Sequence, residues 1–138
     1  MGIRRRSREQ ALQALFYMDM NPNGSKENLE LYCLNFGPAE NSRLFFLRLV
    51  NGVLDYKHEI DAVIERFSDN WKISRMSGVD RNILRIAVFE MLYCQDIPAK
   101  VAINEAIDIG KKFGTSESGA FINGILDSIH MALARQEI

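Results

Sequence analysis

The sequence predicts an all-α protein with about seven helices in two groups. Apolar residues recur at spacings of three and four along most of the 138 residues, and the period-two alternation typical of strands is almost absent. Pro and Gly residues divide the chain into segments of helix length. The composition, 47% hydrophobic and 25% charged, is that of one globular domain with its own core.

The amino-terminal group, residues 1–69, is expected to hold four helices. Residues 21–24, Asn-Pro-Asn-Gly, form a strong helix-breaking sequence, and Gly37-Pro38 forms a second one. The last helix of the group has apolar residues at i, i+3, i+4 and i+7, which predicts a surface helix with one buried side. The expected helices run to about Met20, from Ser25 as N-cap to Phe36, from Glu40 to Lys57, and along Ile60, Val63, Ile64 and Phe67.

The carboxyl-terminal group, residues 77–138, follows a linker from Asn70 to Gly78 that contains a lone Trp71. Ser77-Gly78-Val79-Asp80 matches a capping box, and the helix after it is apolar nearly all round, so we expect it to lie buried at the centre. A second core helix follows Pro98 and ends at Gly114 as C-cap. Ser116 with Glu117 opens the last helix, which has core positions at Phe121, Ile122, Ile125, Leu126, Ile129 and Leu133.

The sequence indicates a cytoplasmic binding protein rather than an enzyme. Cys33 and Cys94 lie far apart in apolar segments, as expected of buried thiols in a reducing compartment. No apolar run is long enough to span a membrane, and polar residues interrupt the basic start, so it does not form a signal peptide. His58 and His130 lack partners at metal-ligand spacing, and neither a phosphate-binding loop nor a nucleophile signature occurs. We therefore expect no catalytic residues, no metal and no cofactor.

Four arginines, Arg4, Arg5, Arg6 and Arg8, stand among the first eight residues, although the net charge of the chain is −1. Cations oppose the dipole at the amino end of a helix, so the local stability of the helix does not explain them. One interpretation is a solvated terminus in which Arg5 pairs with Glu9 at i, i+4. The other is RNA binding, because Arg4 and Arg8 share a helical face and guanidinium groups suit phosphates and base edges.

Four segments of the chain resemble the successive signature blocks of the NusB family of bacterial transcription antitermination factors. These segments are RRRSREQALQALFYMD, VDRNILRIAVFEML, PAKVAINEAIDIGKKFG and SGAFINGILD, and they occur in the order of the family and span most of the chain. The resemblance implies an all-helical fold of two bundles that pairs with NusE, a ribosomal protein of the small subunit. It also implies that the pair binds the boxA element of nascent RNA and joins the antitermination complex of RNA polymerase on ribosomal RNA operons.

The same resemblance assigns candidate RNA-binding residues. The arginine-rich motif of the family falls on Arg4, Arg5, Arg6 and Arg8, and family aromatics associated with the RNA surface match Phe113 and Phe121. Glu117 matches an acidic position of the family that influences antitermination. From periodicity alone, Phe113 and Phe121 are instead core residues, whereas exposed rings would stack on unpaired bases. Their exposure distinguishes the two interpretations.

The surface that binds NusE is expected at Phe16 and Asp80. Asp80 matches an acidic position at which the family contacts NusE, and its alternative role is the capping box with Ser77. Phe16 stands where some relatives carry a tyrosine at this contact. The hydroxyl is missing here, although Tyr17 is adjacent on another face, so a hydrogen bond made by those relatives is in doubt.

Two other functions remain open from the sequence. The first is a protein-interaction scaffold in which the arginines are incidental. The second is the RNA-binding accessory domain of an RNA methyltransferase, which is disfavoured because the chain ends at Ile138 without a cofactor-binding domain. The resemblance leaves a homodimer open as well, because the oligomeric state varies among relatives.

Overall fold

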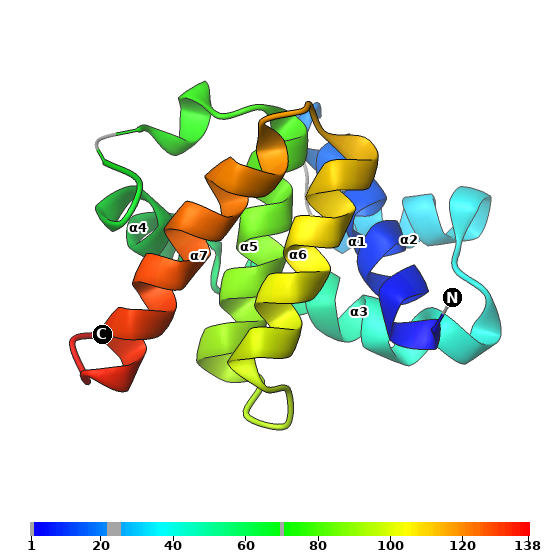
Figure 1. Ribbon diagram of the computed structural model, residues 1–138. Helices are drawn as coiled ribbons and strands as arrows, with labels where there is room; N and C mark the ends of the chain where they lie inside the picture. Colours follow the sequence, from blue (N-terminus) through cyan, green and yellow to red (C-terminus); the bar gives the residue numbers. More distant parts are fainter. Residues whose placement is uncertain (1, 22–25, 70) are drawn as a thin grey trace.

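The computed structural model describes residues 2–21, 26–69 and 71–138. In these ranges the chain forms seven α-helices, one 3-10 helix and no strands, which confirms the predicted all-α class (Figure 1). In chain order they are α1 (Ile3–Asp19), α2 (Lys26–Phe36), α3 (Glu40–Asp55), α4 (Lys57–Arg66), the 3-10 helix η1 (Ile73–Arg75), α5 (Gly78–Tyr93), α6 (Ala99–Phe113) and α7 (Ser118–Ala134).

Helix α5 lies at the centre of the molecule, as its all-round apolar pattern predicts. It packs against α1, α3, α4, α6 and α7 (Figure 1), and residues 82–90 are all buried. The Oγ atom of Ser77 accepts a hydrogen bond of 3.0 Å from the backbone N–H of Asp80, which confirms the predicted N-cap of this helix. Both groups of helices contribute to one continuous apolar core around α5.

Helices α3 and α5 approach each other closely at Gly52. A Cβ atom placed on Gly52 would lie 2.1 Å from Cζ of Phe89, so no larger residue fits without moving the ring. Glycine in the middle of a helix costs about 0.5 to 1 kcal/mol relative to alanine. Here that cost is offset by the buried contact between the Phe89 ring and the backbone of α3.

A buried polar network joins α1, α4 and α5. Asp19, in the last turn of α1, accepts hydrogen bonds from Arg81 at 2.6 Å and from Asn82 at 3.0 Å. Arg85 donates to Asp19 at 3.2 Å and, from its Nε, to Asp61 of α4 at 2.8 Å. These charge-assisted bonds fix how α1 and α4 sit on the central helix.

The observed elements differ from the expected ones at three places. Helix α3 ends at Asp55 instead of Lys57, and the linker contains the short helix η1. The last helix begins at Ser118 with Glu117 as N-cap and has no side-chain cap from Ser116. The Ser118 Oγ accepts the backbone N–H of Thr115 in the turn before the helix at 2.9 Å. The predicted break at 22–24 and the predicted N-cap Ser25 lie outside the described residues.

No helix in the described ranges is both long enough and apolar enough to cross a membrane.

Candidate nucleic-acid interface

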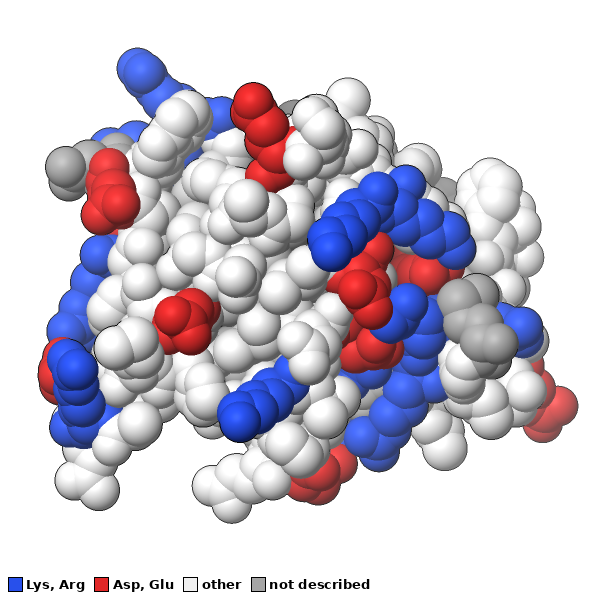
Figure 2. All heavy atoms as spheres, in the orientation of Figure 1, with Lys and Arg blue, Asp and Glu red and all other residues white. Residues whose placement is uncertain are grey.

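The first two turns of α1 carry the arginine cluster, and they lie beside α3 and α6. In Figure 2, basic and acidic side chains intermingle on the side of the molecule where α1 and α6 lie in Figure 1. The four arginines of the cluster have four different environments. They therefore have to be considered one at a time.

Arg8 is buried and acts as a structural residue. Its side chain is 4% exposed, and its Nη2 donates to the 1% exposed Glu90 of α5 at 2.6 Å. A further bond of 3.0 Å joins Nη1 to Glu105 of α6. Burial raises the pKa of Glu90, whereas the Arg8 hydrogen bonds and charge oppose that rise. In this arrangement the Arg8 guanidinium does not face solvent, and it links α1 to α5 and α6.

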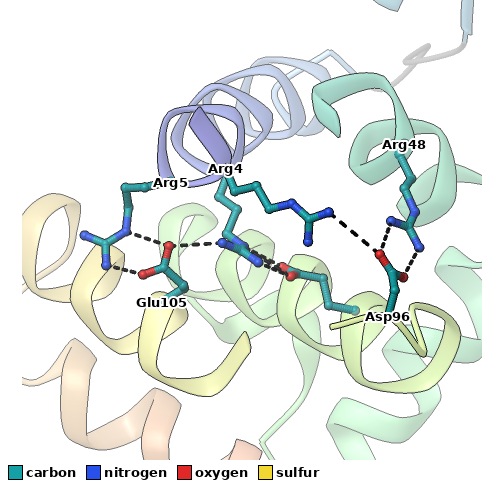
Figure 3. Close-up of polar contacts among 7 residues, drawn as sticks. Arg4, Arg5, Arg48, Asp96 and Glu105 are labelled. Atoms are coloured by element: carbon teal, nitrogen blue, oxygen red, sulfur yellow. Dashed lines mark hydrogen bonds and ion pairs between the residues drawn. The ribbon is translucent and has the colours of Figure 1, made fainter. Parts of the chain in front are cut away.

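Arg5 is half-buried and faces two carboxylates of α6. Its Nε donates to Glu105 at 2.9 Å (Figure 3). Its Nη2 donates to Asp108 at 2.9 Å. The Arg5 hydrogen bond is the main cause that holds the pKa of Glu105 below its usual value. Glu9 pairs with Lys112 of α6 at 3.1 Å, so the expected pairing of Arg5 with Glu9 is not observed.

These contacts give a tertiary explanation for part of the cluster, which the local stability of α1 does not explain. The helix-dipole argument considers only α1 itself, whereas Arg5 and Arg8 find their partners on helices distant in sequence. Arg8 and Glu90, for example, are 82 residues apart. Tertiary ion pairs thus account for Arg5 and Arg8, the two less exposed arginines of the cluster.

Arg4 and Arg6 remain open to solvent. The side chain of Arg4 is 54% exposed, lies 3.8 Å from Asp96 and stacks over the Phe45 ring at 4.7 Å. Arg6 is exposed, and within the described part of the chain its side chain has no ion pair or hydrogen bond. Both guanidinium groups are available to an incoming anion.

The two candidate aromatic residues lie near the turn between α6 and α7, and neither is fully buried. Phe113 packs against the core and has Lys112 Nζ 5.2 Å from its ring centre. Phe121 contacts Trp71 edge-on at 6.2 Å, and both rings line a surface hollow of about 300 Å³. Glu117 is exposed beside them. Each ring thus packs against the core and keeps an accessible portion, so exposure leaves both sequence interpretations open.

The arginines and the aromatic residues do not form a single cluster. Arg5 contacts α6 at residues 105 and 108, and Phe113 follows five to eight residues later on the same helix. At 1.5 Å per residue this separation is about 10 Å along the axis. A short single strand could therefore contact both groups along α6.

The candidate partner-binding residues Phe16 and Asp80 do come together. The ring of Phe16, 38% exposed, rests on the first turn of α5, where a Cβ on Gly78 would lie 2.7 Å from its Cε2. The Oδ1 atom of Asp80 is buried and has no hydrogen-bond partner among the described residues. Tyr17 instead packs against Tyr32 of α2. Phe16 thus presents an exposed ring at the start of α5, beside Gly78 and in the same helical turn as Asp80, which follows two residues later.

Sequence reasoning missed two residues of this surface: Trp71, which contacts Phe121, and Arg48, which binds Asp96. Trp71 is recognised in the sequence only as a lone residue in the linker, and its contact with Phe121 depends on how the linker packs over α7. The role of Arg48, whose Nη2 donates to Asp96 at 2.6 Å, has no local signal, because the two residues are 48 positions apart.

The fold and this surface define a small all-helical binding protein with exposed arginines at one end of its first helix. The sequence model of the NusB family matches residues 5–131, and the chain belongs to this family. The transcription antitermination protein NusB of Desulfatibacillum aliphaticivorans is 57% identical over 137 residues, which cover 99% of this chain and 96% of that relative.

Solved structures agree with the assignment. NusB of T. maritima is 38% identical with a TM-score of 0.83, covering 93% of this chain and 90% of that one. A chain from a crystal structure of the antitermination factors NusB and NusE in complex with dsRNA has a TM-score of 0.82 over 94% of this chain and 97% of its own. At 24% identity, this second likeness concerns the fold alone.

Proposed function

We propose that this protein is a cytoplasmic, non-catalytic transcription antitermination factor that binds boxA-type single-stranded RNA together with NusE. In this role it joins the antitermination complex of RNA polymerase and supports elongation on ribosomal RNA operons. The observation that carries the RNA-binding part is the exposure of Arg4 and Arg6 on a chain that belongs to the NusB family.

Charge supports a joint RNA site. The chain has a net charge of −1, and Arg5 and Arg8 are already paired with carboxylates, so few cations remain for phosphates. Because RNA affinity depends strongly on the number of phosphates neutralised, this protein alone should bind RNA weakly. A basic partner beside it would extend the contact and raise the affinity. Phe113, Phe121 and Glu117 would then face the bases.

A binding titration tests the RNA-binding part. BoxA-like RNA is titrated with the wild type, with Arg4→Gln/Arg6→Gln and with Arg135→Gln, each with and without NusE. Arg135 is an exposed arginine at the end of α7, and its replacement controls for the loss of a surface positive charge outside the arginine cluster. We expect weaker binding only in the Arg4→Gln/Arg6→Gln variant, and a gain in affinity with NusE. Equal affinity of all three proteins would contradict the assignment of the arginines.

A second titration tests the NusE surface at Asp80. Asp80→Asn removes the charge but keeps the Ser77 cap, because that cap uses only the backbone N–H of residue 80. Ser77→Ala is the matched control, since it removes the cap, worth about 1 kcal/mol, and keeps the charge. We expect NusE to bind Asp80→Asn more weakly and Ser77→Ala normally. Normal binding of both would show that the role of Asp80 is confined to the helix.

The scaffold function is the second candidate, and one observation favours it: two of the four arginines serve the fold. The scaffold function predicts that the protein binds NusE and that RNA neither joins nor stabilises the complex. The titrations above separate the two functions.

A further inference from the structure

Arg4 and Arg48 converge on one carboxylate. Arg4 extends from α1 and Arg48 from α3, and both point towards Asp96 in the connection between α5 and α6 (Figure 3). The Arg48 Nη1 and Nη2 atoms donate to the two carboxylate oxygens of Asp96 at 3.0 and 2.6 Å. Arg4 lies 3.8 Å from the same carboxylate. Two cations thus share a single anion, which leaves one positive charge in excess.

This ion pair differs from the buried one in its exposure. Half of the Asp96 side chain and 39% of the Arg48 side chain are exposed, whereas Arg8 and Glu90 are almost completely buried. Exposed ion pairs contribute little to stability, because water and salt screen them. A different anion can therefore replace the Asp96 carboxylate without disturbing the core.

The geometry suits a phosphate group in place of the carboxylate. The Arg48 guanidinium presents two N–H donors side by side, the arrangement that binds carboxylate and phosphate oxygens alike. The Phe45 ring supports the Arg4 guanidinium from one face, so this cation is oriented before any ligand arrives. The bond from Arg48 lowers the pKa of Asp96 to about 2. The carboxylate is charged at neutral pH, as an aspartate with the ordinary pKa also is, and it competes there with other anions.

We propose that Arg48 belongs to the RNA-binding surface and that Asp96 occupies the place of an RNA phosphate when no RNA is bound. This inference rests on the proposed function, and it extends the RNA path from α1 to α3. Asp96 keeps the guanidinium groups of Arg4 and Arg48 in positions from which they can bind a phosphate. It also weakens binding to any RNA, because the phosphate has to displace it.

A mutant cycle tests the proposal. Arg48→Gln, Asp96→Asn and the double variant are titrated with a polyuridine single strand and with boxA-like RNA, alongside Arg135→Gln as the control. We expect Arg48→Gln to lower the affinity and Asp96→Asn to raise it, each about threefold to tenfold, the effect of about one phosphate contact. The increase from Asp96→Asn should become smaller when Arg48 is also replaced. Thermal unfolding of each variant verifies that it is folded.

Each outcome decides one point. If Asp96→Asn lowers the affinity as Arg48→Gln does, Asp96 positions the arginines and does not compete, which overturns its proposed role. If both variants bind like the wild type while Arg4→Gln/Arg6→Gln does not, the path does not include Arg48 and the proposed function survives. If the wild type binds neither RNA, with or without NusE, the proposed function itself fails.

Discussion

The side chain of Arg8 depends on Glu90, since both groups are almost completely removed from water. Removing one partner of a buried ion pair leaves an unpaired charge in the core and costs about 3 to 5 kcal/mol. We therefore expect Arg8→Ala to lower the free energy of unfolding by about that amount, measured by urea denaturation. Arg6→Ala is the control, because this exposed residue should change stability by no more than about 0.5 kcal/mol. Equal stability of the two variants would show that the Arg8–Glu90 contact is not formed in solution.

The position of each arginine could not be predicted from the sequence. The cluster is a candidate binding motif because four arginines occur within five residues, but the burial of Arg8 depends on Glu90 and Glu105, which come from two later helices. The same applies to Phe121, whose accessible edge depends on Trp71. Local pattern identified the residues that carry the chemistry, and only tertiary packing separates those that face solvent from those that serve the fold.

At the scale of helices, Asp19 connects α1 to α5 through a pH-sensitive contact. Burial raises the pKa of Asp19, but the hydrogen bonds from Arg81 and Asn82 and the charges of Arg85 and Arg81 bring it below the usual 3.8. A carboxyl with a lowered pKa in the folded chain stabilises the fold above its unfolded pKa. This contribution disappears as the pH falls through the folded pKa.

Asp19→Asn should therefore be less stable than the wild type at pH 7, by about 2 kcal/mol for hydrogen bonds to a charged group. The difference should shrink as the pH falls below about 4, because protonation removes the same charge from the wild type. Urea midpoints between pH 7 and pH 2.5 measure both effects. A difference that is the same at every pH would exclude the Asp19 charge as its cause.

Two helical glycines provide a matched test of helix packing. Gly52→Ala puts a methyl group against the Phe89 ring, whereas a Cβ on Gly124 of α7 meets no atom within 4 Å. Overpacking a core costs about 1 to 3 kcal/mol. Replacing glycine by alanine within a helix stabilises the helix by about 1 kcal/mol. We expect Gly52→Ala to lose about 2 kcal/mol and Gly124→Ala to gain up to about 1 kcal/mol. Thermal unfolding measures both, and a gain at Gly52 would mean that α3 and α5 can separate without cost.

Most helix boundaries were predictable because their signals are local. The Ser77 cap and Gly114 at the end of α6 are encoded within a few residues, and both predictions are confirmed. The start of α7 was not, because its N-cap is Glu117 and it has no side-chain cap. The Ser118 hydroxyl instead accepts the Thr115 N–H in the turn before the helix, a contact that has no signal in the sequence.

For the whole molecule, the small number of cations that the proposed RNA surface offers predicts how RNA binding depends on salt. With Arg4, Arg6 and Arg48 as phosphate contacts, the slope of log affinity against log salt should be about −2 at about −0.7 per phosphate. NusE should make the slope steeper, because a partner that adds cationic contacts raises both affinity and salt dependence. Titrations at four salt concentrations give both slopes. Equal slopes with higher affinity would favour a conformational effect of NusE on this protein.

The Arg8–Glu90 pair also restricts how the sequence can evolve. An apolar pair of similar volume in place of a buried ion pair is often neutral or stabilising, so both end states are acceptable. Either single replacement leaves a lone charge in the core, which makes the intermediate step unfavourable. Among descendants of this gene, an arginine at position 8 and a glutamate at position 90 should therefore be inherited or lost together. The exposed Arg48 and Asp96 face no such barrier of stability, so either can be replaced alone without leaving a charge in the core.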